Sequence, residues 1–94
     1  MNFEWDPHKA EVNLERHGVS FAEAITVFEN PAEVTVPAPD HSDGEQRCLS
    51  LGTTDAGRLV VVVYMERGTT IPIISTWESA ARERRPYDAG NRAR

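Results

Sequence analysis

The chain has 94 residues, 39% of them hydrophobic and 27% charged, and a net charge of −5. This length excludes two separate domains, because a second core needs roughly 50 residues of its own. The longest apolar run, Leu59 to Met65, is much shorter than the roughly 20 residues of a membrane span, so no membrane partner is expected. A single cysteine, Cys48, excludes an internal disulfide and favours a reducing compartment, by default the cytoplasm.

The charge is unevenly distributed. Residues 1–66 hold 4 basic and 12 acidic side chains, whereas residues 82–94 hold five arginines and two acidic residues. The C-terminal end is therefore the cationic pole of an acidic protein, and it is either a phosphate-binding surface or a solvated end. We expect residues 1–88 to form a single domain and residues 89–94 to be a flexible C-terminal tail.

Capping residues predict the first helix, over residues 7–16. Asp6 accepts hydrogen bonds from the first helical turn, and Pro7 has no N–H to satisfy there. Gly18 ends the helix, because glycine tolerates the left-handed conformation that follows a last turn.

A second helix is predicted over residues 21–28. Ser20 and Glu23 are spaced as a capping box, and Pro31 disfavours helical angles at the preceding Asn30. The short connection between the two helices favours a helical hairpin at the N-terminus.

Extended segments follow. The predicted strands cover residues 33–36, 46–51, 58–65 and 70–75. The valine run at residues 60–63 is typical of a central strand buried on both faces. Pro72 cannot donate a ladder hydrogen bond, so its strand is expected at an edge or with that position turned outward. The order of elements predicts an α+β fold with an antiparallel sheet of three or four strands.

A last helix is predicted to begin at a second capping box, Ser75 to Glu78, and to end before Pro86. On this helix Glu78 and Arg82 share one face, Arg85 continues it, and Arg84 and Tyr87 lie close by. A carboxylate beside guanidinium groups is the minimum equipment for cleaving RNA without a metal ion. The alternative interpretation is a helix cap and an ordinary ion pair.

Other chemistry is sparse in the sequence. The three histidines and Cys48 lack metal-ligand spacing, and there is no glycine-rich phosphate loop, so neither a metal nor a cofactor is expected. Lys9, near the start of the first helix, and Arg67, at a strand end, are each either a solvated charge or part of an active site.

Several segments, in order and spacing over residues 3–88, closely resemble the BrnT family of bacterial type II toxins. The segments are Phe3 to Lys9, Arg16 to Val19, Phe21 to Ala24, Val27 to Pro31, Gly57 to Tyr64 with Glu66 and Arg67, Ile73 to Ser75, and Arg82 to Tyr87. The resemblance implies a RelE-like fold, RNA cleavage, and neutralisation by a BrnA antitoxin. It also implies that promoter DNA is bound only through the complex, by the ribbon-helix-helix domain of the antitoxin.

The resemblance also implies roles for individual residues. The implied catalytic residues are Lys9, Arg67, Glu78 and Arg82, and the implied RNA-binding residues are Arg84, Arg85 and Tyr87. Pro72 and Trp77 stand where the family commonly has arginine, which removes two cations from the expected site. Trp77 either stacks on an RNA base or packs against the sheet or the antitoxin. Two functions stay open: a ribonuclease toxin, or a catalytically weak or inactive toxin-fold protein that binds its antitoxin as a co-repressor.

Overall fold

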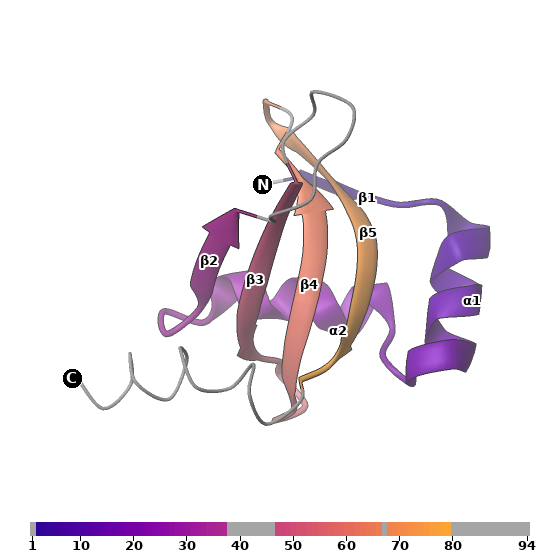
Figure 1. Ribbon diagram of the computed structural model, residues 1–94, viewed down its shortest axis with the longest axis horizontal. Helices are drawn as coiled ribbons and strands as arrows, with labels where there is room; N and C mark the ends of the chain where they lie inside the picture. The colour runs from indigo at the N-terminus through magenta and orange to yellow at the C-terminus, as the bar shows by residue number, and fades with distance from the viewer. Residues whose placement is uncertain (1, 38–46, 67, 80–94) are drawn as a thin grey trace.

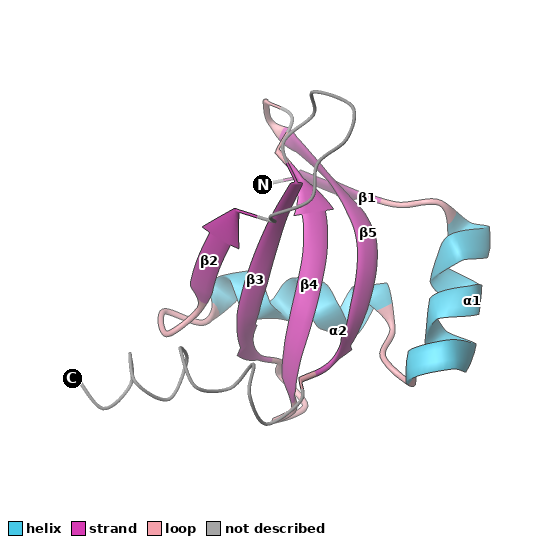
Figure 2. Cartoon of the chain, viewed as in Figure 1, coloured by secondary structure: helices cyan, strands magenta, loops and turns pink. Residues whose placement is uncertain are grey.

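The computed structural model describes residues 2–37, 47–66 and 68–79, and these form an α+β fold (Figure 1; Figure 2). The helical elements are α1 (Pro7–His17), α2 (Phe21–Ala24) and the 3-10 helix η1 (Ile25–Glu29). The strands are β1 (Asn2–Glu4), β2 (Val34–Pro37), β3 (Arg47–Thr53), β4 (Leu59–Met65) and β5 (Thr70–Glu78).

The sheet has five strands in the order β1-β5-β4-β3-β2. Strands β2 to β5 pair antiparallel, whereas β1 pairs parallel to β5 with Phe3 opposite Ile71. The prediction of an antiparallel sheet with three or four strands is therefore wrong in strand number and in the direction of β1. A three-residue strand carries no periodic signal, and its partner lies at the other end of the chain.

The predicted start of a C-terminal helix at Ser75 is also wrong. Strand β5 continues to Glu78, with Thr76 opposite Val62 and Glu78 opposite Val60. A capping-box pattern is a local signal, and here pairing with the valine-rich β4 overrides it. The rest of that predicted helix and the predicted tail at residues 89–94 lie outside the described residues.

Pro72 lies where β5 changes neighbours. Thr70 to Pro72 pair with β1, and the pairing with β4 runs from Ile73 to Glu78. The sequence predicts for Pro72 either an edge position or one turned outward. In the structure Pro72 pairs with Glu4 of β1, precedes the pairing with β4, and is half-buried between the buried Ile71 and Ile73. Beyond Pro72, the side of β5 away from β4 has no strand partner within the described part of the chain, and α1 lies along it instead (Figure 1).

The two helices are not packed as a hairpin, so the prediction of an N-terminal helical hairpin is also wrong. α2 and η1 cross one face of the sheet, while α1 stands beside the β5 edge (Figure 1). The predicted limits of both helices are nearly right, although the second changes from α to 3-10 geometry at Ile25. Each helix is placed by the part of the sheet that it covers.

The core lies between the α2–η1 segment and the sheet. Phe21, Ala24 and Val27 are at most 1% exposed, and the buried face of β4 meets them. The other members of this cluster are Val19, Cys48, Val60, Val62, Tyr64, Ile71 and Ile73. This packing fixes β4 and β5, and thereby the edge against which α1 lies.

Candidate functional site: a cationic groove between α1 and β5

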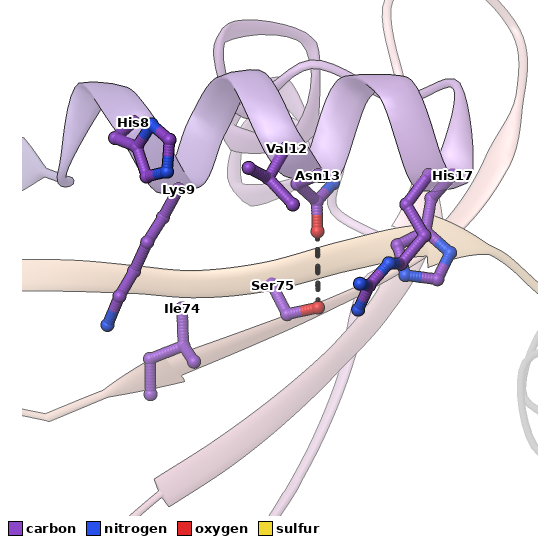
Figure 3. A pocket seen from close by; sticks show the side chains of 8 residues that line it. His8, Lys9, Val12, Asn13, His17, Ile74 and Ser75 are labelled. Carbon is purple, nitrogen blue, oxygen red and sulfur yellow. Dashed lines mark hydrogen bonds between the residues drawn. The ribbon is translucent and has the colours of Figure 1, made fainter.

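An open groove of about 360 Å³ lies between α1 and the edge of β5 that faces it (Figure 3). The residues that line this α1–β5 groove are His8, Lys9, Val12, Asn13, Arg16, His17, Ile74 and Ser75. The side chain of Lys9 extends from α1 toward β5 beside Ile74, and His17 stands at the opposite end of the helix (Figure 3). The groove thus lies between a helix near the N-terminus and strand β5.

Local sequence explains why α1 presents these side chains. Asp6 Oδ1 accepts hydrogen bonds from the backbone N–H groups of His8 (2.8 Å) and Lys9 (3.4 Å), which fixes the first turn. Gly18, with φ of 72°, closes the helix through a hydrogen bond from its N–H to Leu14 O. Between these caps, residues 9, 13 and 16 recur at helical spacing and therefore face the same side.

Asn13 attaches α1 to the strand edge. Its Nδ2 donates to the carbonyl oxygens of Thr76 (2.9 Å) and Val19 (3.1 Å). Its Oδ1 accepts from Thr76 N–H (3.2 Å) and from Ser75 Oγ (3.3 Å). The amide therefore hydrogen-bonds the backbone of β5 as a neighbouring strand would. It fixes the distance between the two walls of the groove.

The charge of the α1–β5 groove is positive. Lys9 and Arg16 are exposed and line it together with two imidazoles, and no acidic side chain among the described residues does so. Glu11 and Glu15 lie on α1 but not in the groove. In a protein with net charge −5, such a local cationic hollow attracts anions, including phosphate.

The structure places only part of the predicted site. Lys9 lines the groove, whereas Glu78 is exposed at the end of β5 and does not line it. Glu78 lies close enough to Arg58 to help raise the pKa of that guanidinium, after the larger effect of Glu23. The predicted residues Arg67, Arg82, Arg84, Arg85 and Tyr87 lie outside the described residues.

The sequence did not predict a role for the other basic side chains of the groove, His8, Arg16 and His17. In the sequence, the histidines lack metal-ligand spacing, and positive charges such as Arg16 and His17 are favourable at a helix C-terminus for structural reasons alone. Arg16 follows Lys9 by seven positions, which is close to two helical turns. That spacing places both cations on one face of α1, and it is the signal in the sequence that could have predicted the groove.

A second polar cluster joins α2 to the β3–β4 turn. Arg58 donates from Nε to Glu23 Oε2 (3.0 Å) and from Nη2 to Glu23 Oε1 (2.5 Å) and Gly18 O (3.0 Å). Thr54 Oγ1 also donates to Glu23 (2.7 Å). These hydrogen bonds, led by that of Arg58, hold the pKa of Glu23 below its ordinary value of 4.5. The predicted capping box is thus only half formed: Ser20 accepts from Glu23 N–H, but the carboxylate binds Arg58.

A second hollow of about 390 Å³ lies over the aromatic rings of Phe3 and Phe28, whose centroids are 5.2 Å apart. Within the described ranges, no three His, Cys, Asp or Glu residues are grouped as a metal site. In the same part of the chain, none of the helices has the length and hydropathy needed to span a membrane.

The fold is shared with a solved ribonuclease toxin. The 1.1 Å crystal structure of the Brucella abortus ribonuclease toxin, BrnT, matches with a TM-score of 0.63 at 20% sequence identity. The match covers 85% of this chain and 97% of that chain. The class that this similarity defines is a toxin-like α+β fold. No curated protein matches the chain.

The family follows from a second comparison. Residues 5–83 match the family model described as the ribonuclease toxin, BrnT, of type II toxin-antitoxin systems. This chain belongs to the BrnT family. The resemblance seen in the sequence is therefore confirmed, and membership of a type II toxin-antitoxin family implies an antitoxin partner.

Proposed function

We propose that this protein cleaves RNA without a bound metal ion or cofactor, that cleavage inhibits growth, and that a BrnA-like ribbon-helix-helix antitoxin neutralises it. One observation carries the proposal: a member of a ribonuclease toxin family holds Lys9 and Arg16 in a groove that no acidic side chain of the described residues lines. A phosphodiester is the substrate group that fits such a charge distribution.

The proposed reaction is an internal transfer of phosphate. The ribose 2′-oxygen bonds to the adjacent phosphorus while the bond from phosphorus to the leaving 5′-oxygen breaks. A base takes the proton of the 2′-hydroxyl, and an acid gives a proton to the 5′-oxygen. Negative charge grows on the phosphate oxygens in the transition state, so a cation held against them lowers the barrier. We assign this role to Lys9.

Further residues are assigned from the family resemblance. Arg67 and Arg82 are proposed as additional catalytic cations, and Glu78 as the group that exchanges a proton. RNA binding away from the reacting phosphate is proposed for Arg84, Arg85 and Tyr87. Of the proposed catalytic residues, Lys9 and Glu78 belong to the described part of the chain, on α1 and β5.

The position of Glu78 brings a second candidate for proton transfer into consideration. His8 and His17 line the α1–β5 groove with Lys9, whereas Glu78 does not. Imidazole exchanges protons near neutral pH more readily than an ordinary carboxylate does. If Glu78 transfers the proton, Glu78→Gln lowers kcat strongly and His8→Ala does not. The reverse result, a strong loss of kcat in His8→Ala but not in Glu78→Gln, assigns proton transfer to His8.

A cleavage assay with purified protein tests the role of Lys9, the only lysine in the sequence. Lys9→Gln is expected to slow cleavage by about 100-fold or more, because it removes a transition-state contact. Arg47→Gln is the matched control, since it removes one positive charge from β3, outside the groove. Excess chelator leaves the wild-type rate unchanged. Equal rates for Lys9→Gln and the control contradict the assignment.

A cellular assay tests the toxin and its partner. Expression without antitoxin is expected to arrest growth, and Glu78→Ala or Arg82→Ala to relieve the arrest. A short adjacent reading frame encoding a ribbon-helix-helix protein supports the proposed antitoxin, through which alone the complex binds promoter DNA. Normal growth with abundant soluble wild-type protein rejects the toxin and favours the co-repressor alternative.

A further inference from the structure

One residue that lines the α1–β5 groove, His17, forms an aromatic pair with Trp77, which is distant in the sequence and does not itself line the groove. The ring centroids of His17 and Trp77 are 6.3 Å apart, and their planes are tilted by 48°. His17 is exposed at the end of α1 and lines the groove, while Trp77 is half-buried on β5. Trp77 follows the groove residue Ser75 by two positions in a strand, so both lie on one face of β5.

The same groove offers positive charge along its length. Arg16 follows Lys9 by seven positions, which corresponds to roughly 10 Å along the helix axis. Successive phosphates of one nucleic-acid strand rise by about 3.4 Å or more, so this distance corresponds to roughly two or three nucleotides. His17 directly follows Arg16, and Trp77 contacts it. Along α1, the two cations Lys9 and Arg16 are therefore followed by the aromatic pair of His17 and Trp77.

We propose that Trp77, supported by the ring of His17, is a stacking surface for an unpaired base of RNA whose phosphates lie along Lys9 and Arg16. This inference rests on the proposed function and deepens it, because it makes the substrate single-stranded RNA. A base in a duplex is stacked on its neighbours and does not offer its face to an indole ring. An acidic peptide satisfies the cations but has no base to place on Trp77.

Binding of an RNA strand with all 2′-hydroxyls methylated tests the proposal without cleavage, because the attacking hydroxyl is absent. Fluorescence anisotropy of the labelled strand measures Kd, and Trp77→Leu is expected to raise Kd about 5- to 150-fold. Trp77→Phe retains much of the affinity because it keeps an aromatic face. Leu14→Ala, on α1 outside the groove and 48% exposed, is the control and binds as wild type does.

The salt dependence of binding separates stacking from charge. Removing a phosphate contact by Lys9→Gln is expected to reduce the slope of log K against log salt by about 0.7. Trp77→Leu leaves that slope unchanged while lowering affinity.

In a Trp5→Phe background, Trp77 is the sole tryptophan, and its emission changes on binding the methylated strand. The same strand annealed to its complement binds more weakly.

The outcomes distinguish this proposal from the proposed function. Unchanged affinity of folded Trp77→Leu and Trp77→Phe proteins, or equal affinity for single strand and duplex, overturns the stacking surface even if wild type cleaves RNA. Loss of antitoxin binding instead of RNA binding by Trp77→Leu also overturns it and makes Trp77 a protein contact. Conversely, the expected binding results with no cleavage of unmodified RNA uphold the stacking surface and reject catalysis.

Discussion

Asn13 is the residue whose removal tests most directly how the α1–β5 groove is built. It is 7% exposed, and its amide makes four hydrogen bonds that join α1 to β5 and to the loop before α2. In Asn13→Ala all four are lost. Three of the partner atoms are backbone groups of Val19 and Thr76, and both residues are fully buried.

The expected size of the effect follows from those three groups. A buried polar group left without a partner costs about 1–3 kcal/mol. At the low end of that range, Asn13→Ala lowers the free energy of unfolding by about 3 kcal/mol. Small domains have about 5–15 kcal/mol in total, so this is a large fraction of the stability. Ser75 is half-buried and is expected to add little, because water replaces its lost partner.

Urea denaturation followed by far-UV circular dichroism measures the loss. The midpoint of Asn13→Ala is expected to fall by about 1–3 M relative to wild type. Leu14→Ala, an exposed neighbour on α1, is the control and changes stability by at most about 0.5 kcal/mol. Asn13→Asp keeps the acceptor for Thr76 N–H but loses both donors, so it is destabilised as well. A loss below about 1 kcal/mol in Asn13→Ala refutes the idea that its amide substitutes for a strand.

Two further predictions concern the rest of the scaffold. The hydrogen-bonded ion pair with Arg58 lowers the pKa of Glu23, so its stabilisation is present above the ordinary value of 4.5 and is lost as pH falls through the lower, folded pKa. Denaturation of wild type and Glu23→Gln should therefore differ most near neutral pH and converge in acid; a constant difference contradicts this. At Gly52, an added Cβ lies 2.7 Å from Val27 Cγ1, so Gly52→Ala is expected to cost about 1–3 kcal/mol in thermal or urea unfolding. The double variant with Val27→Ala should lose less than the sum of the two single losses, and strict additivity argues against the clash.

Local chemistry made part of the fold predictable from the sequence. The limits of α1 follow from Asp6 and Gly18, whose effects act within one helical turn. The β-branched valine run correctly gave β4 as a buried central strand. Each of these signals depends on neighbours close in the chain, so no knowledge of the tertiary structure was needed.

Pairing between distant segments was not predictable in the same way. The residues from Ser75 to Glu78 have a helix-capping pattern, but they extend β5 because they pair with β4. Strand β1 exists because Asn2–Glu4 meet Thr70–Pro72 from the far end of the chain. In both places the free energy of long-range pairing and burial outweighs a weak local preference.

The sequence by itself determined the family and the class of fold, and it identified Lys9 as a candidate catalytic residue. The order and spacing of residues along the chain are enough to indicate a family, because they reflect constraints from every part of the shared fold. Only the tertiary structure decided that Lys9 shares a groove with His8, Arg16 and His17, and that Trp77 meets His17. The physical reason is that Asn13 anchors α1 to the edge of β5 beyond its pairing with β1, a contact between residues 63 positions apart.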